Sequence, residues 1–200
     1  MWVKICGITT VADALAACEA GADAIGLNFW PSSRRYCAPE RAAEIVAALP
    51  PAVVAYGVFV DAGRDVVAAT AERCRLGGLQ FHGKEEAQDL VGWSLPVIRA
   101  VRATSREVVA AALGAAQGYR ILIDSPAGGG SGRRFDPDVV RGLDLSQAIV
   151  AGGLTPENVA EVVRDLAPYG VDVAGGVERS PGVKDHRLVR EFVRRAKGAR

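Results

Sequence analysis

The sequence predicts an α/β protein that folds as a closed (β/α)8 barrel of eight parallel strands. Short apolar runs rich in β-branched residues alternate with longer, alanine-rich amphipathic runs, the pattern of strands alternating with helices. The pattern repeats about every 25 residues, which suits a small barrel. Runs such as Val53 to Val60 are apolar on both faces, as parallel strands covered on both sides require. We expect one domain spanning residues 1–200.

The expected strands are the eight apolar runs. They are Trp2 to Cys6, Ala24 to Phe29, Val53 to Val60, Gly78 to Phe81, Pro96 to Val101, Tyr119 to Asp124, Gln147 to Ala151 and Val171 to Ala174. An open doubly wound sheet is the rival fold, and it usually carries a glycine fingerprint in its first strand-to-helix turn. The turn here, Cys6-Gly7-Ile8-Thr9, carries none, which favours the barrel.

One helix is expected after each strand, where the apolar residues follow helical spacing. The ranges are Val11 to Ala20, Pro39 to Leu49, Arg64 to Arg75, Glu85 to Val91, Ser105 to Ala116, a weak pattern after Asp136, Pro156 to Ala167, and Asp185 to Lys197. No linker, low-complexity tract or second domain interrupts the pattern.

Composition excludes several classes of protein. The 24 basic and 23 acidic residues give a net charge of +1, which predicts no nucleic-acid partner. The start, MWVKICG, lacks the features of a secretory signal, and no segment has the roughly 18 apolar residues of a membrane span. We therefore expect a cytoplasmic protein that does not bind membranes, acting as a monomer or homodimer.

Two strand ends carry residues capable of acid-base chemistry. Catalytic groups of (β/α)8 barrels lie at the C-terminal ends of strands, where this sequence has Cys6 and Asp124. Packing is the alternative role for Cys6, and capping of a turn is the alternative for Asp124. A catalytic cysteine needs a lowered pKa, and Lys4 lies on the same strand face. We expect Lys4 to pair with Asp172 on the neighbouring strand; Cys18, Cys37 and Cys74 are interpreted as packing residues.

Paired glycines end the seventh and eighth strands. Gly152-Gly153 and Gly175-Gly176 occupy matching positions, and barrels often hold a phosphate between these two loops. Two pairs together favour phosphate binding over simple turns. A further glycine-rich loop, which includes Gly129 and Gly130, follows Asp124 and is expected to clamp or cover a ligand.

Other polar residues near strand ends could contact the ligand. Arg34 and Arg35 follow the second strand and could clamp a carboxylate, although a solvated pair is the alternative. His82 follows the fourth strand and is expected to contact the ligand. The chain has only two histidines, so a histidine-based metal site is poorly supported, and we expect neither metal nor cofactor.

Recognisable motifs run along the chain from end to end. They are KICGIT (Lys4 to Thr9), GADAIGLNF (Gly21 to Phe29), SRRY (Ser33 to Tyr36), GVFV (Gly57 to Val60), QFHG (Gln80 to Gly83), IDS (Ile123 to Ser125), GGSG with FD (Gly129 to Asp136), AGGLTPENV (Ala151 to Val159), and GVE with PGVKD (Gly176 to Asp185). In these motifs the sequence resembles the phosphoribosylanthranilate isomerase family of tryptophan biosynthesis. The order and spacing of these motifs are highly specific.

The resemblance implies a role for each candidate residue. It makes Cys6 the general base, Asp124 the general acid and Arg35 the contact for the anthranilate carboxylate, with the paired glycines as phosphate loops. It implies an Amadori rearrangement of N-(5-phosphoribosyl)anthranilate, for which we expect a raised pKa at Asp124 and a lowered pKa at Cys6. The chain departs from the family where Ala174 and Gly175 replace two usual serines.

Four other functions fit the sequence less well. Indole-glycerol-phosphate synthase needs a catalytic lysine at a strand end, and a sugar-phosphate epimerase needs metal ligands; neither set is evident in the sequence. A phosphate-binding sensor or scaffold without catalysis would have no need for both Cys6 and Asp124. An isomerase that also serves histidine biosynthesis would be expected to show a second set of motifs.

Overall fold

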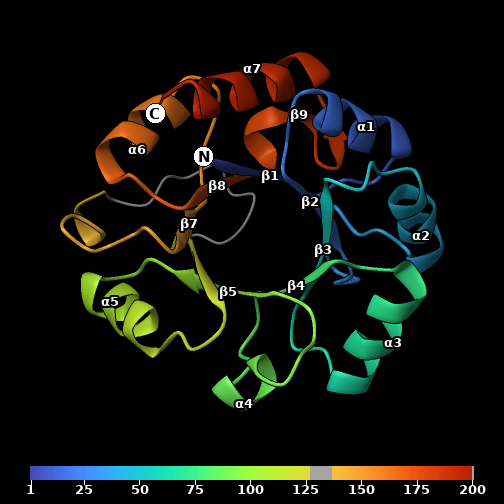
Figure 1. Cartoon of the computed structure of the whole chain (residues 1–200), viewed down its shortest axis with the longest axis horizontal. Helices are drawn as coiled ribbons and strands as arrows, with labels where there is room; N and C mark the ends of the chain where they lie inside the picture. Colours follow the sequence, from blue (N-terminus) through green and yellow to red (C-terminus); the bar gives the residue numbers. More distant parts are fainter. Residues whose placement is uncertain (127–136, 200) are drawn as a thin grey trace.

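The computed structural model describes residues 1–126 and 137–199 and shows a closed barrel of eight parallel strands. Each strand pairs with its neighbour in sequence, and β1 closes the barrel against β8 (Figure 1). The strands are β1 (Trp2–Cys6), β2 (Ala24–Asn28), β3 (Val54–Phe59), β4 (Gly78–Phe81), β5 (Val97–Arg102), β6 (Arg120–Asp124), β7 (Ala148–Val150) and β8 (Gly170–Val173). The predicted barrel is confirmed, and the strands lie where the apolar runs predicted them.

Helices surround the barrel (Figure 1). They are α1 (Val11–Glu19), α2 (Pro39–Ala47), α3 (Arg64–Cys74), α4 (Ala87–Leu90), α5 (Arg106–Ala115), α6 (Val159–Leu166) and α7 (His186–Lys197). Thr10, Ser105 and Asp185 cap α1, α5 and α7 with side-chain oxygens that accept backbone N–H groups. These caps explain why the three helices begin where they do.

The structure corrects two helix predictions and adds a short segment that the sequence did not predict. The helix expected over Glu85 to Val91 shrinks to α4, because Glu85 turns inward and accepts a hydrogen bond from the Asp61 amide at 2.9 Å. The weak pattern after Asp136 forms only the 3-10 turn η1 (Pro137–Val139) in the described part of that segment. Between β8 and α7 the chain adds η2 (Gly175–Val177) and an antiparallel hairpin of β9 (Glu178–Ser180) and β10 (Val183–Lys184), which the sequence did not predict.

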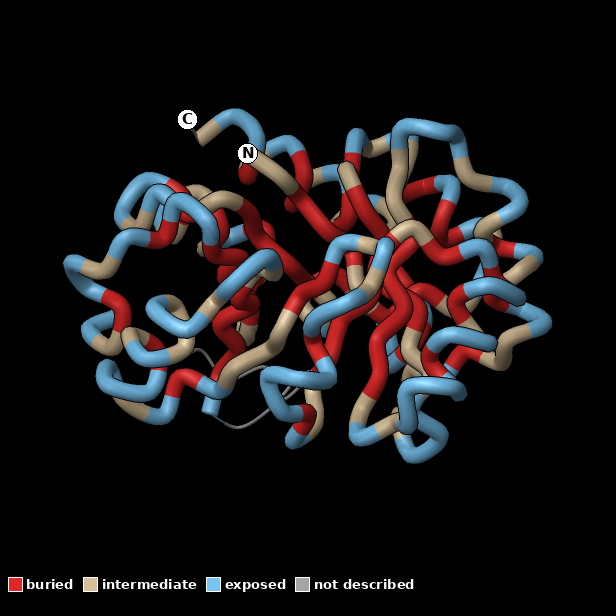
Figure 2. The backbone as a smooth tube through the Cα atoms, turned by 60° about the horizontal axis from the view of Figure 1, so that its bottom comes forward, coloured by how far each residue is buried: buried red, intermediate tan, exposed pale blue. Residues whose placement is uncertain are grey.

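Two apolar cores flank the strands, because successive side chains of a strand point to opposite faces. The outer core, which includes Val3 and Ile5 of β1, packs against the helices. The barrel interior is smaller and is filled by Ala24, Tyr56, Ile98, Leu122, Ile149 and Ala151. Figure 2 shows the buried strands at the centre and the exposed loops around them. Inward positions nearest the C-terminal ends are thereby left to polar side chains.

Lys4 and Asp172 form the ion pair that the sequence predicted. They are direct neighbours in the register of β1 and β8, and the Lys4 Nζ lies 3.1 Å from the Asp172 Oδ1. Lys4 is fully buried, so this carboxylate compensates a charge that water cannot reach.

No helix within residues 1–126 and 137–199 has the length and apolar character needed to cross a membrane.

Candidate active site

A cavity of about 470 Å³ opens at the C-terminal ends of the strands, lined by all eight strands or the loops that follow them. The lining includes every described residue that the sequence predicted for the site: Cys6, Arg35, His82, Asp124, Gly152, Gly153, Gly175 and Gly176. The predicted contacts Gly129 and Gly130 lie outside the described residues. One cavity therefore brings the candidate acid, base and glycine loops together.

Asp124 is the last residue of β6 and is 5% exposed. Its Oδ1 accepts a hydrogen bond from the Ser125 amide at 2.8 Å. Burial raises the pKa of Asp124 from 3.8 to about 6, and the nearby Asp172 adds to the rise, whereas the Ser125 amide and Arg102 oppose it. The predicted rise is confirmed, and it leaves Asp124 mainly ionised at neutral pH with a minor protonated fraction that can act as the acid.

Cys6 ends β1 and lines the same cavity, and the predicted lowering of its pKa is wrong. Burial raises the pKa of the Cys6 thiol more than the positive charges of Lys4 and Lys184 lower it. The ion pair with Asp172 compensates the charge of Lys4, and the negative charge of Asp172 itself raises the pKa of Cys6. Cys6 is therefore mainly a thiol in this environment, and the thiolate is its minor form.

His82 lies immediately after β4 with an uncharged imidazole. Burial, together with the positive charges of Lys4 and Arg102, lowers its pKa to about 4. Its Nε2 lies 2.5 Å from the Nε2 of Gln80, which is fully buried on β4. A neutral histidine offers one ring N–H donor and one ring acceptor, so His82 gives the cavity a polar wall without a charge.

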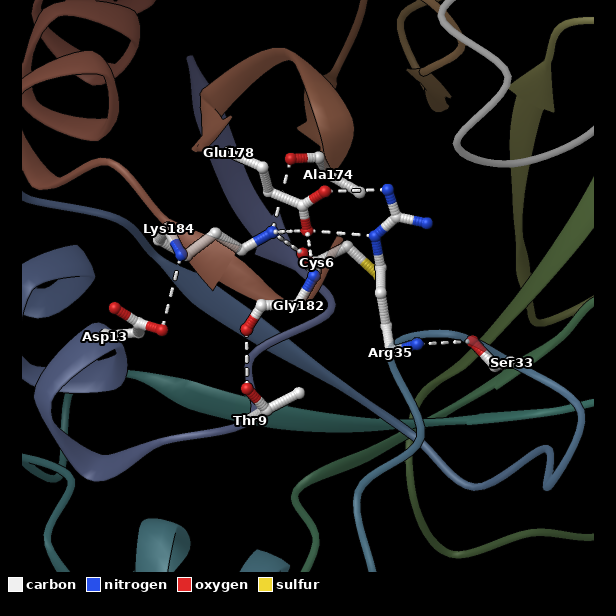
Figure 3. Close-up of polar contacts among 9 residues, drawn as sticks. All are labelled: Cys6, Thr9, Asp13, Ser33, Arg35, Ala174, Glu178, Gly182 and Lys184. Atoms are coloured by element: carbon white, nitrogen blue, oxygen red, sulfur yellow. Dashed lines mark hydrogen bonds and ion pairs between the residues drawn. The ribbon is translucent and has the colours of Figure 1, made fainter. Parts of the chain in front are cut away.

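Arg35 and Arg34, the two arginines of the loop after β2, differ in environment. Arg34 is exposed, whereas Arg35 lines the cavity and donates to Glu178 from Nε at 2.9 Å and from Nη2 at 2.7 Å (Figure 3). This bidentate contact fixes the guanidinium plane. Sequence reasoning missed Glu178, although it lies in the GVE motif.

The two glycine loops approach each other closely. A Cβ on Gly176 would lie 1.9 Å from the Leu154 carbonyl oxygen, so only glycine fits between the loops. Gly152 and Gly153 adopt φ angles of 78° and 68°, the left-handed region that favours glycine. The Asn158 side chain holds this turn, accepting from the Thr155 amide and donating to the Gly153 carbonyl, both at 2.9 Å. The loops form one compact wall of the cavity.

Other charged residues near the cavity were missed from the sequence. Arg102 ends β5 and lines the cavity, and the rule that selected Asp124, a charged residue closing an apolar strand, would have found it. Lys184 is 1% exposed and belongs to the unpredicted hairpin. Within the described ranges, no group of three or more His, Cys, Asp or Glu side chains is arranged to hold a metal ion.

Comparison with known proteins agrees with this geometry. Residues 3–195 match the protein family described as N-(5'phosphoribosyl)anthranilate (PRA) isomerase. The chain belongs to this family. It is 47% identical to the N-(5'-phosphoribosyl)anthranilate isomerase of Myxococcus xanthus, over 98% of this chain and 95% of that protein.

Solved structures give the same result. The phosphoribosyl anthranilate isomerase of Thermotoga maritima is 38% identical, with a TM-score of 0.92 over 99% of both chains. A structure of phosphoribosyl anthranilate isomerase in complex with reduced 1-(o-carboxyphenylamino)-1-deoxyribulose 5-phosphate is 36% identical, with a TM-score of 0.88 over 99% of both chains. The latter ligand carries a phosphate and an aromatic carboxylate, the two groups expected at the glycine loops and at Arg35.

Proposed function

We propose that Cys6 and Asp124 act as general base and general acid in the reaction of this chain. As a phosphoribosylanthranilate isomerase, the chain converts N-(5-phosphoribosyl)anthranilate into 1-(2-carboxyphenylamino)-1-deoxyribulose 5-phosphate during tryptophan synthesis. The observation that carries the assignment is that Cys6 and Asp124 line one cavity, with the pKa of Asp124 raised to about 6. An acid with this pKa can donate a proton near neutral pH.

The proposed reaction consists of proton transfers. Protonated Asp124 gives its proton to the furanose ring oxygen, the C1–O bond breaks, and the nitrogen lone pair forms the protonated Schiff base. The Cys6 thiolate then removes the proton from C2, the electrons of that C–H bond form the C1–C2 double bond, and the π electrons of the C=N bond return to the nitrogen. The enolamine that results tautomerises to the ketone. Side chains supply both the acid and the base of these steps, and we propose that the reaction needs neither cofactor nor metal.

The remaining cavity residues orient the substrate. We propose that the glycine loops at Gly152-Gly153 and Gly175-Gly176 bind the phosphate through backbone N–H groups. Arg35 binds the anthranilate carboxylate, for which the bidentate geometry of a guanidinium is suited. His82 adds an uncharged polar contact. Two anionic groups held at separate points fix the sugar between the acid and the base.

The site as proposed needs only one chain. Every group given a role comes from the same barrel, so a monomer is competent, and a homodimer would contribute no catalytic group. Cys6 and the other three cysteines are free thiols. Because a catalytic free thiol suits a reducing compartment, we propose that the protein works in the cytoplasm.

Turnover of phosphoribosylanthranilate, followed by its fluorescence, tests the assignment. We expect activity in the unmodified protein and in a Cys18→Ala control, and losses of at least about 100-fold in Cys6→Ala and Asp124→Ala. Circular dichroism would establish that each variant folds. An unmodified protein that binds reduced 1-(o-carboxyphenylamino)-1-deoxyribulose 5-phosphate, called reduced product below, without turning over substrate would indicate a sensor. Full activity in either variant would exclude the acid-base pair.

A further inference from the structure

Lys184 lies beside the active site but has no part in the chemistry proposed above. It is the last residue of β10, and its Nζ donates to the Cys6 carbonyl at 2.6 Å, the Ala174 carbonyl at 3.2 Å and the Glu178 Oε1 at 2.8 Å (Figure 3). These oxygens belong to the end of β1, the phosphate loop after β8 and the start of the hairpin. One buried cation therefore joins three segments that surround the cavity.

The surroundings of Lys184 require its charged form. Three acceptor oxygens around one nitrogen need three N–H donors, and only the ammonium group has three. Burial lowers the pKa of Lys184 below its ordinary value, and the negative charge and hydrogen bond of Glu178 oppose this only in part, so the case for the charged form rests on the three acceptors. A neutral amine would leave one of the three oxygens without a donor. We therefore treat Lys184 as an ammonium ion.

Glu178 is shared between two cations. It accepts from Lys184 on Oε1 and from Arg35 on both carboxylate oxygens, while the Gly182 amide also donates to Oε1 at 3.2 Å. Two positive charges and one negative charge leave the Arg35-Glu178-Lys184 cluster with a net charge of +1. Without Lys184 the cluster would be neutral, because Glu178 would compensate Arg35 alone.

The hairpin that carries Lys184 is fixed to the barrel independently of this cluster. Thr9 donates through Oγ1 to the Gly182 carbonyl at 2.6 Å, and the Lys184 amide donates to the buried Asp13 at 3.4 Å. The backbone around Lys184 is thus held by the loop after β1 and by α1. Loss of the Lys184 side chain should remove its charge and three hydrogen bonds while leaving the hairpin attached.

We propose that Lys184 is a positioning residue, which keeps Arg35 electrostatically available to the substrate carboxylate and holds the strand ends that carry Cys6 and the phosphate loop. The proposal rests on the function proposed above. It assigns two separable effects to one side chain. The charge acts on substrate binding through Arg35, and the hydrogen bonds to the Cys6 and Ala174 carbonyls act on the alignment of the base.

Kinetics of Lys184→Met and of the double variant Lys184→Met/Glu178→Gln separate the two effects. In Lys184→Met we expect the KM to rise about 10- to 100-fold, the range of one charge-assisted contact, and the kcat to fall as well. The double variant has the net charge of the wild-type cluster again, so its KM should return toward the wild-type value. Its kcat should stay low, because the bonds to the two carbonyls remain absent.

A structural brace without these roles gives different results. Unchanged KM and kcat in a folded Lys184→Met variant would overturn the proposal, as would a raised KM that Glu178→Gln fails to lower. Lys197→Met is the matched control, since Lys197 forms an exposed ion pair with Asp23 at 3.0 Å, and both constants should stay at wild-type values. Calorimetric titration with reduced product gives the affinity independently of turnover.

A folding failure would not end the test. If Lys184→Met does not fold, Glu178→Gln, whose cluster carries a net charge of +2, is compared with the double variant, whose cluster carries +1. We expect a higher KM and a lower kcat in the double variant; equal kcat values would refute the proposal. Wild-type protein that neither turns over substrate nor binds reduced product would refute the proposed function, and the role of Lys184 with it. Active wild type with an unaffected Lys184→Met variant would refute the role of Lys184 alone.

Discussion

Replacing Asp124 by asparagine should slow catalysis strongly and stabilise the protein at the same time. Asparagine has nearly the same shape, and its Oδ1 can keep the hydrogen bond from the Ser125 amide. It cannot donate the catalytic proton of a carboxylic acid, so we expect activity to fall about 10²- to 10⁴-fold. It also removes a carboxylate that burial disfavours, and this should increase the free energy of unfolding.

The raised pKa sets the size and sign of the stability change. The folded protein binds the Asp124 proton more tightly than the unfolded chain, because the pKa rises from 3.8 to about 6. The contribution of Asp124 to the free energy of unfolding of the wild type is therefore greatest below pH 3.8 and declines as the pH rises to about 6. One pKa unit corresponds to about 1.4 kcal/mol, so Asp124→Asn should gain about 3 kcal/mol at pH 8 and about 1.5 kcal/mol at pH 5.

Urea unfolding at both pH values measures this difference. A gain of about 3 kcal/mol would raise the Tm by about 6–12 °C in a chain of this length. Asp165→Asn on α6 is the control, because Asp165 is exposed and its replacement should change stability by less than about 0.5 kcal/mol. A gain that does not depend on pH, or no gain at pH 8, would refute the inference that burial raises the pKa of Asp124.

Three further predictions concern the active site. The kcat/KM of the wild type should rise with pH up to about 6, the pKa of Asp124, and then stay level until Cys6 titrates; a pH–rate profile with no break near 6 would contradict this. Gly26→Ala would place a Cβ 2.7 Å from the Cys6 Sγ and 2.9 Å from the Lys4 Nζ, so the kcat should fall about 10²-fold, whereas titration with reduced product should give an unchanged affinity. Gly176→Ala would force the two phosphate loops apart, because its Cβ would lie 1.9 Å from the Leu154 carbonyl oxygen. The inhibition constant of inorganic phosphate should then rise about tenfold or more, equal to about 1.4 kcal/mol. An unchanged inhibition constant would place the phosphate elsewhere.

The sequence predicted the barrel because its signals are local. Apolar runs, turns and helical spacing lie within single segments, and the closed barrel follows from repeating them eight times. The pairing of Lys4 with Asp172 was also predictable, since both occupy inward positions on strands that the barrel makes neighbours. The β9–β10 hairpin was missed because its strands have only three and two residues, too few to show an alternating pattern.

The rest of the site depends on contacts between distant segments. Arg35 and Glu178 are 143 positions apart, and Lys184 reaches a carbonyl 178 positions away, so no local pattern indicates these bonds. The predicted direction of the Cys6 pKa was wrong for a related reason. The nearby Lys4 is evident in the sequence, but the depth of burial that outweighs it is a property of the folded cavity.

Both pKa shifts together determine how the acid and base can cooperate. At neutral pH the resting pair is an ionised Asp124 and a protonated Cys6, whereas the reactive pair is a protonated Asp124 and a Cys6 thiolate. The resting and the reactive forms of the pair each hold one proton, so at pH values between the two pKa values the ratio of these forms does not change with pH. The difference between the pKa values of Asp124 and Cys6 sets the fraction of the protein in the reactive form. Each unit by which the pKa of Cys6 is lowered raises that fraction about tenfold. Lys4 and Lys184, which both lower the pKa of Cys6, therefore contribute to the rate without touching the substrate.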